Sequence, residues 1–144
     1  MSRKDEIAKE ISHLLPNLIR HMYPFVFEPI ALPPSQVLAL CILCEKGSCR
    51  LGELSHEMHN SAPTASGIVD RLESGGYVKR REDEDDRRVT HILATEKGNK
   101  IAEQFRGNIR ERWQFILSKL SESDGEEVLK VLQRITKAFT YETR

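Results

Sequence analysis

The 144-residue sequence contains no apolar run that approaches the roughly 18 residues a membrane-spanning helix needs. Its first ten residues, MSRKDEIAKE, also lack the apolar stretch of a secretion signal. These absences predict a chain that neither enters a membrane nor is secreted. Its 39% hydrophobic and 31% charged residues suit a soluble, helix-rich protein of about one domain.

Cysteine is scarce, and its spacing excludes a disulfide framework. The three cysteines, Cys41, Cys44 and Cys49, are an odd number, which favours a reducing compartment and a cytoplasmic protein. Cys41 and Cys44 lie one helical turn apart among apolar residues, which predicts core packing. Cys49 is the better candidate for a redox-active thiol, provided that it is exposed near Arg50.

Signatures of catalysis are missing as well. The sequence has no glycine-rich phosphate loop, no paired carboxylates in an apolar setting and no nucleophile beside a base. His56 and His59 are poorly spaced for a metal site. We therefore expect a protein that is not an enzyme and that binds neither a metal nor a cofactor.

Net charge is zero, because 22 basic residues balance 22 acidic ones. Composition thus gives no electrostatic sign of a nucleic-acid partner. The charges are nevertheless clustered in KRREDEDDRRVT, residues 79–90, where five consecutive acids stand between basic residues. Such a run is ordinarily a solvated loop, so its flanks decide whether it has a function.

The spacing of apolar residues predicts helices around one β-hairpin. Steps of three and four predict a long first helix from Arg3 to about Phe27, kinked at Pro16. YVKRR and RVTHILA are expected as strands joined by the acidic run, with a further short strand near residues 48–51. The other helices are expected over residues 35–46, 51–59, 61–74 and 95–120, and from a cap at Ser121 or Ser123 onward.

Two short helices followed at once by a hairpin make a winged helix-turn-helix in a mainly α, α+β chain. A helix fits the major groove of DNA, and a hairpin reaches an adjacent minor groove. We assign residues 34–95 to this lobe, residues 1–33 to an N-terminal dimerisation helix and linker, and residues 96–144 to C-terminal dimerisation helices, all in one structural domain. The apolar stripes of the terminal helices predict a two-fold homodimer.

The acidic run then has an interpretation as the tip of the wing. Asp86 precedes Arg88 by two residues, close enough to pair with its guanidinium and to direct it into a narrow, negative groove. The remaining acids, Glu82 to Asp85, are expected in water, pointing away from DNA. On the preceding helix, residues 62–67 present short side chains where Lys and Glu are the usual surface choice, which favours a close contact.

With these elements in place, LGELSHEM…SAPTASGIVDRLESGGYVKRREDEDDRRVTHILATEKG resembles the DNA-binding lobe of MarR-type transcriptional regulators. That family follows its helix-turn-helix with DRLE, a glycine, V-x-R, a D-x-R wing and a TEKG-like helix start. LPPSQVLAL resembles its entry to the second helix. The resemblance covers nearly the whole chain. It implies a homodimer, usually a repressor, that binds a pseudo-palindromic operator in double-stranded DNA and is released by a small ligand or by thiol oxidation.

The resemblance also implies which residues contact DNA. Those presented to the major groove are Ser61, Ala62, Pro63, Thr64, Ser66 and Gly67. Arg71 is implied near a phosphate, and Arg87 and Arg88 in the wing contact. Unlike many relatives, residues 61–67 contain no Lys or Arg. Arginine-to-guanine pairing, worth about 1–3 kcal/mol, is therefore unavailable from these residues, and we expect modest base discrimination.

Two alternatives remain at this point. A winged-helix module that binds protein instead of DNA fits the zero net charge and the missing cations. A DNA-binding regulator controlled by thiol redox chemistry fits Cys49. In the DNA-binding dimer the two recognition helices should lie about 34–36 Å apart, and a small-molecule effector would act by favouring a different spacing.

Overall fold

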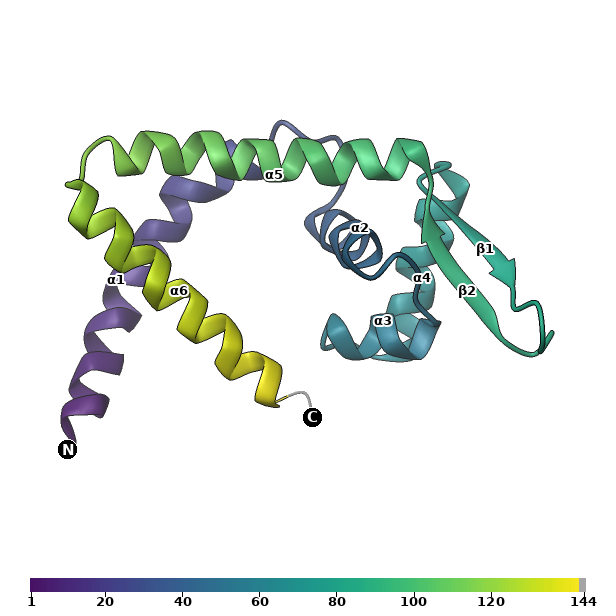
Figure 1. Cartoon of the computed structure of the whole chain (residues 1–144), viewed down its shortest axis with the longest axis horizontal. Coiled ribbons are helices and arrows are strands. Elements are labelled where there is room, and N and C mark those ends of the chain that lie inside the picture. Colours follow the sequence, from purple (N-terminus) through teal and green to yellow (C-terminus); the bar gives the residue numbers. More distant parts are fainter. Residues whose placement is uncertain (143–144) are drawn as a thin grey trace. The chain divides into compact units, whose positions relative to one another are not determined.

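The computed structural model describes residues 1–142 of the chain (Figure 1). Among the described residues, no helix combines the length and the apolar character that crossing a bilayer would require. Over this range the elements in order are α1 (Arg3–Val26), α2 (Pro34–Lys46), α3 (Leu51–Glu57), α4 (Ala62–Ser74), β1 (Val78–Glu82), β2 (Thr90–Ala94), α5 (Glu96–Leu117) and α6 (Glu122–Glu142). The mainly helical chain with one antiparallel hairpin confirms the predicted fold class.

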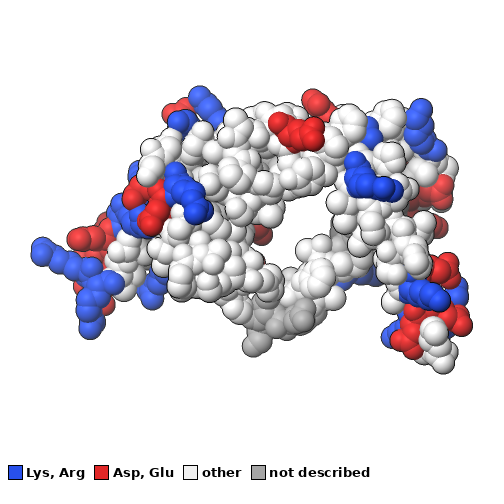
Figure 2. Space-filling model, turned by 180° about the vertical axis from the view of Figure 1, so that it is seen from behind, with Lys and Arg blue, Asp and Glu red and all other residues white. Residues whose placement is uncertain are grey.

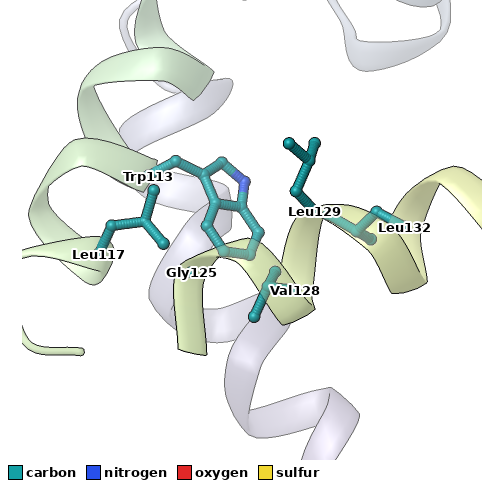
Figure 3. Close-up of a pocket in the computed structure, with 6 residues that line it drawn as sticks. All are labelled: Trp113, Leu117, Gly125, Val128, Leu129 and Leu132. Atoms are coloured by element: carbon teal, nitrogen blue, oxygen red, sulfur yellow. The ribbon is translucent and has the colours of Figure 1, made fainter. Parts of the chain in front are cut away.

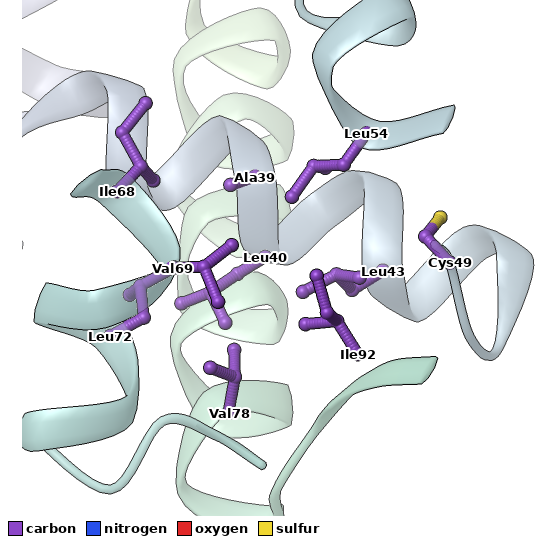
Figure 4. Packing of buried hydrophobic residues seen from close by; sticks show 10 residues of the cluster. All are labelled: Ala39, Leu40, Leu43, Cys49, Leu54, Ile68, Val69, Leu72, Val78 and Ile92. Atoms are coloured by element: carbon purple, nitrogen blue, oxygen red, sulfur yellow. The ribbon is translucent and has the colours of Figure 1, made fainter. Parts of the chain in front are cut away.

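The chain divides into two compact units, Met1–Asn108 and Ile109–Arg144, and the division falls inside α5. The first unit holds the helix-turn-helix and the hairpin. Its core joins α2, α3 and α4 to both strands, as Figure 4 shows. Leu40, Leu43, Leu54, Val69 and Leu72 are fully buried there. Each such side chain contributes about 1.5–3 kcal/mol by leaving water, and together they fix α4 against the hairpin.

Local signals set the ends of the helices beside the hairpin. Gly47 ends α2 with φ 81°, a left-handed value that a glycine adopts without strain. The turn between α3 and α4 also needs a left-handed residue, and His59 supplies it with φ 55°. Histidine is among the residues other than glycine that adopt this conformation more readily than most. Ser61 is the N-cap of α4, since its Oγ accepts a hydrogen bond from the backbone N–H of Thr64.

The hairpin pairs Val78 with Ala94 at one end and Glu82 with Thr90 at the other. Cys49 adds one bridge at its edge, where its N–H donates to Ile92 O at 3.0 Å and its carbonyl accepts from Ile92 N–H at 2.7 Å. The expected short strand at residues 48–51 is therefore a single paired residue. We refer to β1, β2 and the loop between them as the wing.

The beginning of α5 lies tightly against the chain before the wing. A Cβ on Gly98 would collide with the carbonyl oxygen of Tyr77 and would lie 3.0 Å from a methyl group of Leu40. Further along, the rings of Phe27 and Phe105 are 5.1 Å apart, and Asn108 Nδ2 donates to Val26 O at 3.2 Å. These contacts fix the end of α1, which runs through Pro16 and Pro24 as a single helix of 24 residues, to the first part of α5.

The second unit consists of the end of α5 and of α6. Ser121 caps α6, because its Oγ accepts from the N–H of Asp124 at 3.1 Å, and α5 ends at Leu117, three residues before the expected limit. An apolar hollow of about 190 Å³ lies within this unit (Figure 3). Its lining residues are Trp113, Leu117, Gly125, Val128, Leu129 and Leu132.

Candidate nucleic-acid interface

Helix α4 has one buried and one open face. Ala65, Ile68, Val69 and Leu72 are at most 3% exposed and pack into the core. The residues that the resemblance assigns to the major groove lie on the other side. Ser61, Ala62, Pro63 and Thr64 are exposed, and Ser66 and Gly67 are partly so. No other described element of the first unit covers the N-terminal turns of α4, so a groove-sized partner can reach them.

The hydroxyl groups at this end of α4 have different tasks. Ser61 Oγ accepts from Thr64 N–H and donates to Thr64 Oγ1 at 2.9 Å, so its hydroxyl is engaged in the cap. The Thr64 hydroxyl keeps its own proton for an outside acceptor, and the Thr64 methyl group can contact a thymine methyl. Thr64 is therefore the better candidate of the two for reading bases.

The tip of the wing holds Arg88 in a fixed direction. Asp86 Oδ1 accepts from the backbone N–H of Arg88 at 3.0 Å and from its Nε at 3.1 Å, and Asp86 Oδ2 accepts from Nη2 at 3.1 Å. These bonds to Arg88 hold the pKa of Asp86 below its usual value. The side chain of Arg88 is nevertheless 91% exposed. The pairing expected from the spacing is present, and the guanidinium is aimed without being buried.

A second acid organises the loop that carries this pair. Asp83 Oδ2 accepts from the backbone N–H groups of Asp85 and Asp86, each at 3.1 Å, and Asp83 Oδ1 lies 2.7 Å from His91 Nε2. The hydrogen bond to His91, then those to the loop, keep the pKa of Asp83 below its usual value. Asp83 is therefore held by the loop and only partly exposed, whereas Glu82, Glu84 and Asp85 are exposed, as expected for the tip of a hairpin. The signal missed in the sequence was His91, which β2 places across the hairpin.

Basic residues near α4 are not equally available to a partner. Arg80 on β1 binds two carboxylates of α4, Asp70 at 2.8 Å and Glu73 at 2.5 Å, and these interactions raise its pKa. Arg80 therefore joins the wing to α4. Arg71 is exposed and has no side-chain ion pair or hydrogen bond within the described part of the chain. On the face seen in Figure 2, basic and acidic side chains mix over the wing, at the left, without a patch of one sign.

The cysteines do not have the surroundings that the redox alternative requires. Cys49 is only 1% exposed, and burial raises the pKa of its thiol. The redox hypothesis required an exposed thiol at Cys49, and the thiol is buried. A buried, protonated thiol reacts slowly. Cys41 and Cys44 are partly buried instead of fully packed in the core, and Cys44 Sγ donates to Asn99 Oδ1 at 2.9 Å. Burial raises the pKa of both thiols.

An exposed helix face beside an aimed wing arginine defines the first unit as a winged helix-turn-helix of the DNA-binding class. The MarR family model matches residues 32–90, from just before α2 to the first residue of β2. A solved structure of a MarR family protein from Bacillus stearothermophilus is similar over 97% of this chain and 99% of its own, with a TM-score of 0.83 and 27% sequence identity.

Two curated relatives agree with this assignment. YsmB of Bacillus subtilis, an uncharacterized HTH-type transcriptional regulator, is 27% identical over 85% of this chain and 82% of its own length. The transcriptional repressor MprA of Escherichia coli is 40% identical over 40% of this chain, which is 32% of its own length. These comparisons support a MarR-family winged-helix transcriptional regulator, a class of DNA-binding proteins that are not enzymes.

Proposed function

We propose that the protein is a homodimeric repressor that binds a pseudo-palindromic operator and leaves it when a small effector binds. Repression is proposed because MprA, to which 40% of this chain is similar, is a transcriptional repressor. The observation that carries the proposal is the pairing of an uncovered α4 face with the exposed, Asp86-directed guanidinium of Arg88. A regulator of chromosomal operators acts in the cytoplasm, and we place this protein there.

In the proposed complex the first turns of α4 enter the major groove. Ser61, Ala62, Pro63, Thr64, Ser66 and Gly67 lie on the open face, and their short side chains let the helix backbone approach base edges closely. Arg88 enters the neighbouring minor groove, where the negative potential of a narrow groove attracts a guanidinium. Arg87 adds positive charge beside the phosphates, and Arg71 is a further exposed cation on α4.

The homodimer is proposed because the helices at both ends of the chain expose apolar side chains. On α1, these are 42–68% exposed and comprise Ile7, Ile11, Leu14, Leu15, Leu18 and Ile19. On α6, Leu129, Leu132, Ile135 and Phe139 are 45–61% exposed. Because these side chains are already about half buried, covering the rest of each would contribute about 1 kcal/mol, and the sum over both helices favours a second copy that covers them. The hollow of Figure 3 suits a partner side chain, since ligand pockets usually measure about 300–1,000 Å³.

Effector control follows from the dimer. Two recognition helices must be about 34–36 Å apart to enter successive major grooves on one side of the duplex. An effector that binds more tightly to a dimer with another helix spacing shifts the population away from the DNA-binding state. The size of that shift is limited by the difference between its affinities for the two states. Because Cys49 is buried, we assign this control to a bound small molecule and not to thiol oxidation.

Selection of bound duplexes from a random pool tests the proposal. The expected result is an enriched inverted repeat whose half-sites are about 10 base pairs apart. Affinity for the selected duplex should fall steeply as salt rises, with a slope of log K against log salt of about −0.9 per neutralised phosphate. A pool without an inverted repeat, or an affinity that salt barely changes, would instead favour the protein-binding alternative.

A further inference from the structure

The side chain of Arg71 lies over Gly67, one helical turn nearer the start of α4. A Cβ built on Gly67 would be 3.9 Å from Nη2 and 4.0 Å from Nη1 of Arg71. Helical side chains lean toward the N-terminus of their helix, so a long side chain at residue 71 covers residue 67. The guanidinium therefore stands beside the first turns of α4, although residues 61–67 contain no cation of their own.

The charge of this guanidinium is available to a partner. Arg71 is exposed and makes no side-chain hydrogen bond or ion pair among the residues that the structure describes. The two carboxylates nearest to it in sequence along α4, Asp70 and Glu73, both bind Arg80 of β1. Arg80 thus engages the acids that would otherwise compete for Arg71.

The side chains next to the guanidinium on α4 are short. Between Ala62 and Gly67 the open face of α4 carries only short side chains, so no long neighbour stands between this guanidinium and a base edge. Its two terminal nitrogens are at nearly equal distances from the Gly67 Cβ position, so the forked end of the guanidinium, which carries paired donors, lies over Gly67. Guanine offers two acceptors, O6 and N7, at its major-groove edge.

We propose that Arg71 reads a guanine in each half-site of the operator by a bidentate pair, through the space that Gly67 leaves free. The inference rests on the proposed function, because it requires α4 in the major groove. It replaces the phosphate contact implied for Arg71 by the family resemblance. It also supplies the arginine-to-guanine readout that the sequence of residues 61–67 excludes.

Lysine separates the two roles, because it keeps the charge and loses the planar fork. The test measures the affinity of the wild type and of Arg71→Lys for the selected operator and for a set of duplexes in which each base pair is changed in turn. The wild type should lose about 5- to 150-fold when one G·C pair of a half-site is replaced, the range of a bidentate arginine–guanine pair. Arg71→Lys should have equal affinities for the operator and for the duplex in which that G·C pair is replaced. Its affinity should depend on salt with the same slope as that of the wild type.

Two further variants make the test specific. Gly67→Leu fills the space under the guanidinium and should abolish the preference at the same G·C pair. Arg134→Lys makes the same substitution on the exposed surface of α6, outside the proposed interface, and should retain every preference of the wild type.

Three outcomes would overturn the inference. Arg71→Lys could keep the wild-type preference at every base pair. Arg71→Ala could weaken all duplexes equally and lower the salt slope by about 0.9, as the loss of one phosphate contact does. If the wild type itself enriched no inverted repeat, the proposed function would fail together with this inference. In the first two outcomes the wild type still selects an operator, and only the inference about Arg71 fails.

Discussion

Asp86 holds the guanidinium of Arg88 through two parallel hydrogen bonds of 3.1 Å, while the side chain of Arg88 remains 91% exposed. A third bond, from the backbone N–H of Arg88 to Asp86 Oδ1, fixes the loop at the same point. An exposed pair of this kind contributes little to folding stability. Its consequence lies in binding, because a long side chain that is already ordered loses less entropy when it enters a groove.

Replacement of Asp86 by Asn should therefore weaken operator binding without changing its salt dependence. The expected loss is about 2- to 10-fold, the cost of immobilising one freely rotating long side chain. Arg88→Ala should weaken binding further and also lower the salt slope, because a cation is removed. Equal salt slopes for Arg88→Ala and the wild type would show that Arg88 does not face the DNA. Fluorescence anisotropy over a series of salt concentrations measures both quantities.

The wing should lose order in acid and not at neutral pH. The pKa of Asp83 and that of Asp86 both lie below the ordinary value of 3.8 in the folded protein. A lowered pKa means that the stabilising contribution is complete above about pH 4–5 and is lost as the pH falls through the folded value. Carboxyl chemical shifts followed by NMR should give midpoints below 3.8 for both residues. His91→Phe should raise the midpoint of Asp83, because His91 is the main cause of its shift.

Gly98→Ala should destabilise the first unit by about 1–3 kcal/mol, the usual cost of overpacking. The added methyl group has no room between the Tyr77 carbonyl oxygen and Leu40. Gly52→Ala on α3 is the matched control, since nothing lies within 4 Å of its Cβ position, and alanine should stabilise that helix by about 0.5–1 kcal/mol. Denaturant unfolding followed by circular dichroism measures both. A neutral Gly98→Ala would contradict the close approach of α5 to Tyr77.

Leu132→Glu should convert the dimer to monomers and abolish operator binding at concentrations that saturate the wild type. The leucine is 45% exposed on α6 and lines the apolar hollow, so the substitution places a charge on the face that the second copy covers. Lys130→Glu is the control, because residue 130 lies two positions earlier and therefore roughly 200° around the helix. Sedimentation equilibrium gives the mass of each variant. Dissociation of both variants alike would point to a general effect of charge on α6.

The parts of this structure that could be predicted from the sequence are those set by local rules. The cap at Ser61, the stop at Gly47 and the pairing of Asp86 with Arg88 each depend on residues at most four positions apart. The buried face of α4 follows from helical periodicity. A single sequence contains enough information for contacts of this range.

Other features depend on packing between distant segments. Asp83 meets His91 only because the hairpin register brings them together, and Arg80 reaches α4 only because β1 returns beside that helix. Cys49 is buried by its bridge to Ile92, although its sequence neighbours are polar or small. The position of the Arg71 guanidinium depends on a side-chain direction and on which acids are already paired. Neither can be inferred from the identity of residues 61–67.

The central claim is that α4 and Arg88 contact two adjacent grooves of one duplex, and inosine substitution tests it most directly. An inosine–cytosine pair presents the major groove of G·C and, lacking the guanine amino group, the minor groove of A·T. The test changes A·T pairs that lie beside the half-site, where the wing would enter the minor groove. For the wild type, replacing A·T by G·C should weaken binding, whereas replacing it by inosine–cytosine should leave binding unchanged. Arg88→Ala should bind the A·T, G·C and inosine–cytosine duplexes equally. If inosine–cytosine weakens the wild type as much as G·C does, or if Arg88→Ala keeps the wild-type preference, the wing arginine does not read the minor groove.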